Sequence, residues 1–381
     1  MKALRLATSA LALGLAASLS AFAETGVTES TVTLGMSVPL SGPSAGHGKE
    51  LQGVVAAYFD QVNKAGGVNG RKIELVALDD GYETERTLAN TKALLETKKV
   101  FALVSYYGST PTTEAMNQAF GPAGVPLVGT ISGAQTLRQD PGASRHNRFM
   151  FNLRASYADE VEAIANQLVT LGLKNIAVFY QNDGFGKAGL DGLTATLKKH
   201  GLAPSAVGSV ERNSDDVAKA VEAIAKANPQ AVVMVTLYKP TAALVRALRK
   251  AGQNPMFMTL SPVGGDQLFQ ELGNDARGIG ISQVMPYPWN DTVPVVKDYQ
   301  RLVGKQGGYS YMGMEAYVTA RVAVEAMKRA GKDLTREKLV AALEGLNQDI
   351  GGFRVGFTPA NHSGSRFVEL TVIGANGRMM K

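Results

Sequence analysis

Apolar, β-branched runs alternate with amphipathic helical patterns along most of this chain. Each run is followed by a helical pattern: within residues 50–65 one face carries most of the apolar side chains, and residues 215–227 repeat this arrangement. Alternation of this kind is typical of a doubly wound α/β architecture with buried parallel strands. The predicted strands are residues 32–38, 72–78, 101–105, 126–129, 175–180, 231–236 and 255–260.

The same alternation predicts two lobes. It restarts after Asn152-Leu153-Arg154, near the middle of the chain. The 358 residues from Glu24 onward also exceed the roughly 250 to 300 residues at which single cores stop growing. Interruptions at residues 151–157, 281–289 and 351–359 predict three crossings between the lobes, which would act as hinges. We therefore predict a first lobe of residues 24–152 plus 284–355 and a second lobe of residues 153–283 plus 356–381.

The first 23 residues have the pattern of a secretory signal peptide. Lys2 and Arg5 give a positive start, residues 10–19 are apolar but too few to span a bilayer, and Ala21-Phe22-Ala23 supplies the small-residue cleavage pattern. We predict cleavage after Ala23 and a periplasmic location, with a hydrophobic N-terminal core element as the alternative. Since the chain has no Cys, we expect neither a lipid anchor at the cut nor a disulfide.

The charge and hydropathy of the mature chain argue against two classes of partner, nucleic acids and membranes. Without Lys2 and Arg5 it carries 37 basic and 33 acidic residues, a net charge of +4, with both signs interspersed. Because no basic run is interleaved with stacking aromatic residues, the pattern argues against nucleic acid as a partner. No second apolar stretch approaches the roughly 20 residues of a membrane helix, so we expect a soluble mature chain without membrane insertion.

Polar loops that follow the predicted strands are candidates for a ligand site. Ligands of open α/β sheets bind beyond the carboxyl ends of the strands, so two facing sheets would enclose a ligand between them. Residues 41–48 offer hydroxyls and N–H groups to an anionic or polar ligand, and these small, polar residues outnumber the usual two to six of such a loop. An ordinary connection is the alternative. Thr110, before Pro111, also fits a simple helix cap.

The ordered set of loops resembles one family. It is similar to the periplasmic substrate-binding proteins of the leucine/isoleucine/valine-binding type, which feed ABC importers and have the type I periplasmic binding protein fold. The resemblance covers nearly the whole mature chain. It rests on Pro39-Leu40-Ser41-Gly42-Pro43, Asn63-x-x-Gly66-Gly67-Val68-x-Gly70-Arg71, Asp79-Asp80, Tyr107-Gly108-Ser109-Thr110, Thr130-Ile131-Ser132-Gly133-Ala134, Gln181-Asn182-Asp183-Gly184-Phe185-Gly186 and Tyr238-Lys239-Pro240.

This resemblance implies roles for individual residues. The loop at Ser132 and Gly133 would contact the carboxylate of the ligand. Phe185 and Tyr238 would close over the ligand from the second lobe; the alternative is that each aromatic side chain packs in a hydrophobic core. Arg154 would bind an additional carboxylate or, equally, brace the hinge. The candidate ligand-binding residues are Ser41, Ser44, Tyr107, Gly108, Ser109, Thr110, Thr130, Ser132, Gly133, Arg154, Tyr157, Asp183, Phe185, Tyr238 and Ser261.

One position departs from the family's amino-acid binders. The acid that would pair with the α-ammonium of an amino acid is expected after the strand at residues 255–260, where this chain has Ser261. Asp266 follows five residues later, and a place in the next helix explains it more simply. An ammonium group enclosed without an anionic partner would cost several kcal/mol. We therefore expect a small polar ligand with a carboxylate or amide that is not a plain leucine-like amino acid.

Two short motifs favour other functions. Gly184-Phe185-Gly186-Lys187-Ala188-Gly189 matches a dinucleotide fingerprint, but Asp183 would repel a pyrophosphate. Gly42-Pro43-Ser44-Ala45-Gly46 matches the nucleophile motif of a serine hydrolase using Ser44, although no suitable acid and His follow it. Asp79-Asp80 lacks the further ligands of a metal site.

The resulting prediction is a monomeric receptor that is not an enzyme and needs no cofactor or metal. The resemblance implies that it delivers its ligand to an ABC permease and ATPase complex in the inner membrane. Presentation of the loaded lobes to a chemoreceptor or sensor kinase is the alternative among binding proteins.

Overall fold

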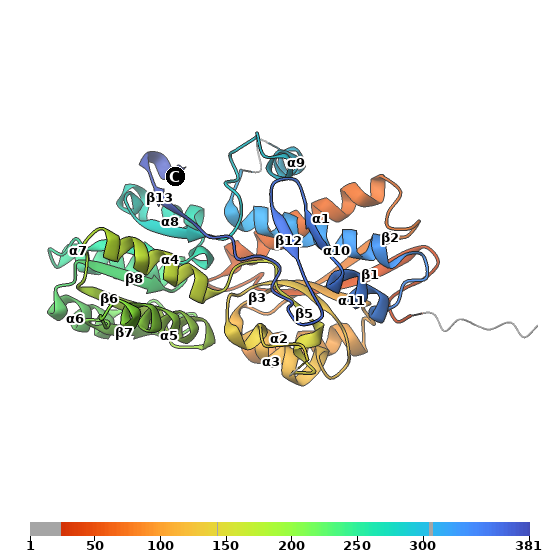
Figure 1. Ribbon diagram of the computed structural model, residues 1–381, viewed down its shortest axis with the longest axis horizontal. Coiled ribbons are helices and arrows are strands. Elements are labelled where there is room, and N and C mark those ends of the chain that lie inside the picture. Colours follow the sequence, from red (N-terminus) through yellow and green to blue (C-terminus); the bar gives the residue numbers. More distant parts are fainter. Residues whose placement is uncertain (1–23, 143, 305–307) are drawn as a thin grey trace, which may run out of the picture.

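The computed structural model describes residues 24–142, 144–304 and 308–381. The predicted signal peptide, residues 1–23, lies outside the described residues. The first sheet has five parallel strands in the order β2-β1-β3-β4-β5, and the second has seven in the order β14-β13-β10-β9-β8-β6-β7. In the second sheet β13 pairs antiparallel with both β10 and β14, and the other pairs of described strands are parallel. Figure 1 shows the two sheets in separate halves of the molecule, each with helices on both faces.

The strands are β1 (Thr31–Val38), β2 (Lys72–Asp79), β3 (Ala102–Tyr107), β4 (Leu127–Ile131), β5 (Met150–Phe151), β6 (Ile176–Gln181), β7 (Val207–Val210), β8 (Ala231–Val235), β9 (Met256–Thr259), β10 (Gly280–Gln283), β11 (Asn347–Asp349), β12 (Arg354–Gly356), β13 (Glu369–Ile373) and β14 (Met379–Met380). The α-helices are α1 (Ala45–Lys64), α2 (Thr84–Glu96), α3 (Ser109–Ala115), α4 (Tyr157–Thr170), α5 (Gly184–Lys199), α6 (Ala218–Ala227), α7 (Tyr238–Lys250), α8 (Gly265–Leu272), α9 (Pro294–Val303), α10 (Tyr311–Ala330) and α11 (Arg336–Glu344).

The chain passes between the halves three times. It leaves the first sheet after β5, returns after β10 to form α9, α10 and α11 beside the first sheet, and crosses again between β12 and β13. This is the predicted α/β class, two doubly wound lobes joined by three crossings. We call the half with β1–β5 the first lobe and the half with β6–β10 the second lobe; the residue at which each lobe begins stays a prediction.

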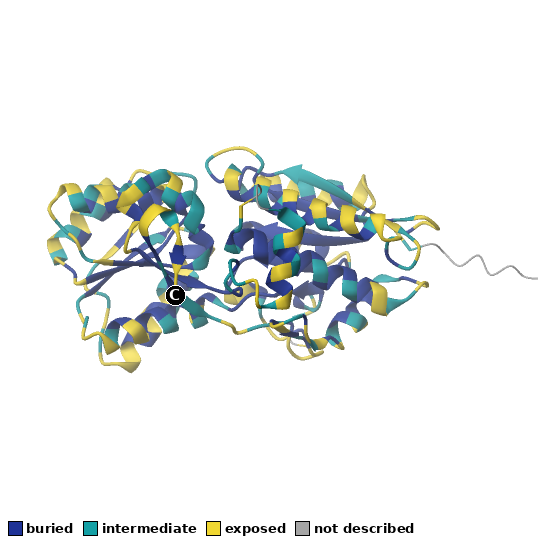
Figure 2. Ribbon diagram, turned by 90° about the horizontal axis from the view of Figure 1, so that it is seen from above, coloured by how far each residue is buried: buried dark blue, intermediate teal, exposed yellow. Residues whose placement is uncertain are grey.

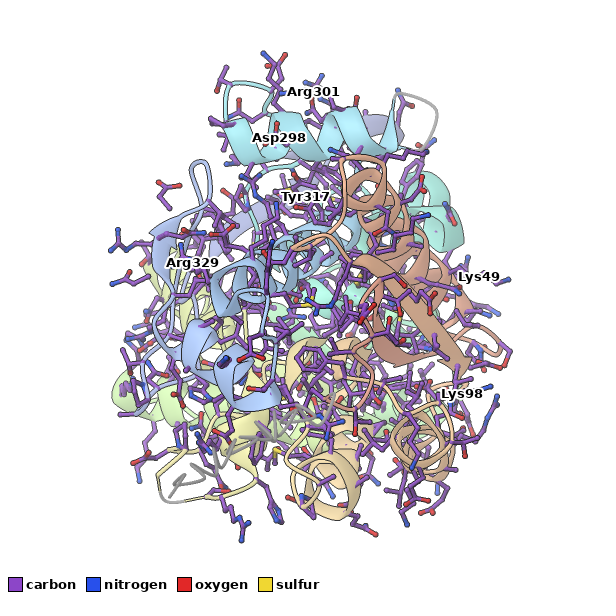
Figure 3. All side chains as sticks on the ribbon, turned by 90° about the vertical axis from the view of Figure 1, so that its right-hand side faces the viewer. Lys49, Lys98, Asp298, Arg301, Tyr317 and Arg329 are labelled. Atoms are coloured by element: carbon purple, nitrogen blue, oxygen red, sulfur yellow. The ribbon has the colours of Figure 1, made fainter. Side chains whose placement is uncertain are left out.

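Buried strands occupy the centre of both lobes, as Figure 2 shows. In the first lobe, α10 packs against α1 and against strands β3 and β4, and most of its residues are buried. Figure 3 views this lobe from its outer end, where α9, with Asp298 and Arg301, lies above α10, with Tyr317. Arg321 donates to Asp298 across this contact (Nη1–Oδ2, 3.0 Å). Among the described residues, no helix has both the length and the apolar character needed to cross a membrane.

Helix α1 begins earlier than the sequence indicates. It starts at Ala45, whereas the apolar pattern predicts a start at residue 50. Gly48 explains the difference, because a Cβ atom there would lie 1.9 Å from the carbonyl oxygen of Pro39, so the glycine permits close contact between helix and loop. The connection after β1 therefore runs from residue 39 to 44. This is an ordinary length for such a loop, so the loop is not unusually long as the sequence predicts.

Candidate functional site

Two buried serine hydroxyls lie at the carboxyl ends of β3 and β4. The Oγ atoms of Ser109 and Ser132 are 2.8 Å apart, and both residues are almost fully buried. Gly108 precedes α3 with φ +89°, and a Cβ atom there would lie 2.3 Å from the Tyr82 ring. Only glycine fits both constraints, so Gly108 fixes the position of Ser109. The structure brings these predicted residues together.

The first crossing packs directly on this pair. Gly133 accepts a hydrogen bond from the backbone N–H of Tyr157 (2.9 Å), and a Cβ atom on Gly133 would lie 2.5 Å from that nitrogen. Tyr157 begins α4, whose N-cap Ser156 forms a capping box with Asp159. Thr130 lies nearby, but its hydroxyl is 3.0 Å from that of Thr112, within the first lobe.

Arg154 forms a buried charge cluster that joins both lobes at the first crossing. Its guanidinium lies 3.2 Å from Glu160 of α4 and 3.6 Å from Glu315 of α10, and it donates to the hydroxyl of Ser261. Burial alone lowers the pKa of Arg154, but the two carboxylates outweigh burial and raise it. Burial raises the pKa of Glu315 to about 7, although Arg154 opposes the shift. These contacts join Arg154 to side chains of both lobes, and both of its expected roles, brace of the hinge and binder of a ligand carboxylate, stay predictions.

Ser261 is held in place by the same cluster. Its backbone N–H donates to Glu160 (2.9 Å), and Ser282 donates to the same carboxylate oxygen (2.6 Å). The position that departs from the family pattern is therefore occupied by a hydroxyl that already contacts Arg154. Asp266 lies in α8, and burial, followed by the nearby Glu50, raises its pKa to about 7.

The second lobe supplies aromatic residues to the contact. Phe185 is buried with its ring 5.0 Å from that of Tyr157, and the hydroxyl of Tyr238 donates to the carbonyl oxygen of Pro43 in the first lobe. Asp183 caps α5 by accepting from the N–H groups of Phe185 (2.9 Å) and Gly186 (3.3 Å). Burial raises the pKa of Asp183, against these hydrogen bonds.

The remaining predicted residues lie at the edges of this contact. Ser44 is buried and lines a cavity of about 150 Å³ together with Gln181 and Tyr238. The hydroxyl of Thr110 accepts from the N–H of Gly184 in the second lobe (2.9 Å). Ser41, by contrast, is exposed and donates to Asp79 (2.6 Å), so the structure does not place its hydroxyl with the others.

Sequence reasoning missed several residues of the interlobe contact. The hydroxyl of Tyr107, a predicted residue, lies 2.8 Å from Nδ1 of His47, whose ring is 4.9 Å from that of Tyr238. Tyr82 accepts from Gln181 across the lobes (2.9 Å). The available signal was position, because Tyr82 follows β2 and Gln181 ends β6, both at carboxyl ends of strands.

A second polar contact, separate from the Arg154 cluster, also joins the two lobes. We call it the rim contact, and it joins residues 81–84 of the first lobe to Arg212 and Asn213 of the second. Asn213 donates to the carbonyl oxygen of Gly81 (3.1 Å) and to Glu83 (2.6 Å). Arg212 donates to the hydroxyl of Thr84 (2.8 Å) and lies over the Tyr82 ring, 5.6 Å from its centre.

Comparisons with known proteins identify similar chains. Residues 31–378 match a family model described as periplasmic binding protein. The crystal structure of a possible leucine/isoleucine/valine-binding protein from Rhodopirellula baltica SH 1 is similar with a TM-score of 0.86 and 31% identity, covering 94% of this chain and 98% of that one. A substrate-binding periplasmic protein from Ralstonia solanacearum gives 0.85 and 33%, covering 92% and 99%. An amino acid binding protein from Pseudomonas aeruginosa is 26% identical over 254 residues, and this match spans 66% of each chain, just under two thirds.

Proposed function

Since this chain belongs to the periplasmic binding protein family, we propose that it captures a small polar ligand between its lobes and delivers it to an ABC import permease. The ligand is an amino acid, a carboxylate or an amide-like compound. Like its relatives, the chain is a binding protein and not an enzyme.

The hydroxyl pair of Ser109 and Ser132 carries this proposal. Both hydroxyls are buried where Tyr157 of the crossing and Phe185 of the second lobe meet the first lobe. A carboxylate accepts hydrogen bonds only, and these two hydroxyls, which are bonded to each other at 2.8 Å, are able to give up that bond and donate to its two oxygens. Closure of the second lobe then removes the ligand from water, which strengthens these bonds.

We also propose a periplasmic location and an ABC permease complex as the partner. Residues 1–23 direct export, and cleavage follows Ala23, so the mature chain acts in the periplasm as a monomer. Its partners are the ligand and a permease with its ATPases, which recognise the closed lobes. Both lobes are needed for that recognition, because the lobes approach each other only when the cleft closes.

Calorimetry on matched hydroxyl variants tests the site. The ligand panel is amino acids, aliphatic and aromatic carboxylates, and amides, screened first by thermal shift. For the carboxylate that binds most tightly, we expect the double variant Ser109→Ala, Ser132→Ala to bind at least tenfold more weakly. The reason is the loss of two hydrogen bonds to a charged group, each of about 1.5–3 kcal/mol.

Thr113 and Thr136 provide the control. Their hydroxyls are 2.9 Å apart on the exposed side of the same two segments, so they repeat the geometry outside the cleft. Thr113→Val combined with Thr136→Val is expected to bind like the unmodified protein. Equal affinity in the two double variants would place the ligand elsewhere, and the absence of binding by every panel member would overturn the proposed ligand class.

A further inference from the structure

Two carboxyl groups that the proposed function does not use meet where the lobes touch. Glu50 belongs to α1 of the first lobe, and Asp266 lies in the first turn of α8 in the second lobe. The amide of Gln267, next to Asp266, donates to the Glu50 carboxylate across the lobes (Nε2–Oε2, 2.9 Å). Opening of the lobes would therefore break this bond and separate the two acids, which we call the acid pair.

Both members of the acid pair are shielded from bulk water in the described structure. Ser310, which precedes α10, donates its hydroxyl to Glu50, and both acids are only partly exposed. Asp266 lines a cavity of about 10 Å³ together with Ser310 and Tyr311. This volume holds about one water molecule at most, so closure removes most of the water around the Asp266 carboxyl group.

The charged groups near the acid pair do not neutralise it. The elements packed against it carry His47 and Lys49 of α1, Lys239, Arg246 and Arg249 of α7, Glu271 of α8, Tyr299 of α9, Tyr311 and Glu315 of α10, and Asp275 and Arg378 in the turns beside α8. Lys49, Lys239 and Arg378 are exposed. Arg246 and Arg249 donate to backbone carbonyl oxygens at the far end of α8. Burial lowers the pKa of His47 to about 3, so this ring is uncharged at neutral pH.

Burial is the main reason that the pKa of each acid is raised. The pKa of Asp266 rises to about 7, to which the charge of Glu50 contributes. Burial also raises the pKa of Glu50, against the hydrogen bonds from Ser310 and Gln267. An open cleft returns Asp266 to water and to a pKa near its ordinary 3.8. Because the closed form has the higher pKa, this contribution to closure is complete in acid and is lost as the pH rises through 7.

We infer that ligand capture is coupled to proton uptake, because closure of the lobes brings Glu50 and Asp266 together and binds a proton on this pair. Ligand affinity then rises as the medium becomes more acidic. This inference concerns the regulation of the proposed site and rests on the proposed function. It makes the receptor load more readily in acidic surroundings and release its ligand more readily in alkaline ones.

Calorimetry on the mature chain at pH 6 and pH 8 tests the coupling. The probe is the panel member that binds most tightly and keeps one charge state across this range; leucine, 4-methylpentanoate and benzoate all meet this condition. From closed and open pKa values of about 7 and 3.8, we expect binding to be about five- to tenfold tighter at pH 6. At pH 7, the heats in two buffers of different ionisation enthalpy should show uptake of about half a proton per ligand.

Variants that keep the shape of each acid assign the proton. Asp266→Asn cannot take up the proton, so we expect it to bind equally at pH 6 and pH 8, with an affinity near that of the unmodified protein at pH 6. Glu50→Gln removes the charge that helps to raise the pKa of Asp266, so the ratio of the two affinities should shrink. Asp275→Asn is the matched control, because Asp275 is an exposed acid just beyond α8 that pairs with Arg249 (3.9 Å). This control is expected to keep the full ratio.

Glu315 is the competing source of such a pH dependence, since its pKa is also about 7. A ratio that vanishes in Glu315→Gln and survives in Asp266→Asn would overturn the inference. Equal affinities at pH 6 and pH 8 in the unmodified protein would also overturn it and leave the proposed function intact. The same holds for release of protons on binding, which a cationic ligand held by the acid pair would cause. Binding by no member of the panel at either pH would overturn the proposed function, and the inference with it.

Discussion

Replacing Asn213 by glycine removes the central hydrogen bonds of the rim contact. Asn213 has φ +59°, a conformation in which alanine would add strain but glycine does not. The variant Asn213→Gly therefore deletes the side chain without disturbing the backbone. The Asn213 bonds to Gly81 and Glu83 join the two lobes, so opening of the lobes would break them, and we expect the variant to weaken ligand binding.

The magnitude follows from the two bonds. A neutral hydrogen bond contributes about 1 kcal/mol, and one to a charged acceptor about 1.5–3 kcal/mol. Because the Glu83 side chain is 47% exposed, solvent screening places its bond below that range, and the closed form loses about 2 kcal/mol in total. If the unliganded protein is mainly open, this loss appears in full as a roughly 30-fold weaker affinity.

Calorimetry with the tightest ligand of the panel measures the change. Asn228→Gly is the matched control, because Asn228 also has a positive φ (+44°) but ends α6, outside the rim contact. Both glycines increase the flexibility of the unfolded chain alike, so the two melting temperatures should be similar. Affinity within twofold of the unmodified protein in Asn213→Gly would refute the view that the rim contact stabilises the closed form.

Two further predictions concern the aromatic residues and the buried acid. Phe185→Ala and Tyr238→Ala are each expected to weaken binding by more than about 1 kcal/mol, measured by calorimetry, and unchanged affinity in both would assign the rings to the core alone. Glu315 has a folded pKa of about 7, above its usual 4.5, so its contribution favours folding below pH 4.5 and is lost as the pH rises through 7. In Glu315→Gln, scanning calorimetry between pH 5 and 8 should therefore show a smaller fall in melting temperature, and an identical fall would contradict the assignment.

Strands and topology follow from local pattern, which is why the sequence predicts them well. The apolar runs at residues 32–38 and 231–236 coincide with β1 and β8 to within one residue. The missed strands include β5, β7 and β10, which have two, four and four residues, too few for a pattern to develop. The start of α1 was missed because Gly48 is required by its close contact with the Pro39 backbone, and the apolar periodicity carries no sign of that contact.

The site was less predictable because its contacts are distant in sequence. Ser109 and Ser132 each follow a strand, so their proximity follows from parallel order. The carboxylates that surround Arg154 come from α4 and α10, 6 and 161 positions away, and no periodicity relates these positions. The same holds for His47, whose partners Tyr107 and Tyr238 lie at the end of β3 and at the start of α7.

In the proposed closure, the Arg154 cluster would lie near the axis about which the lobes rotate. Arg154 lies in a crossing and contacts one carboxylate from each lobe. A rotation of the lobes would therefore move the atoms of this cluster only a short distance. A rotation that opens the lobes would break the rim contact, in which Asn213 of the second lobe donates to the carbonyl oxygen of Gly81 in the first. In the proposed closure, the buried charges would thus stay near the axis of rotation, and the half-buried polar groups of the rim contact would favour the closed form.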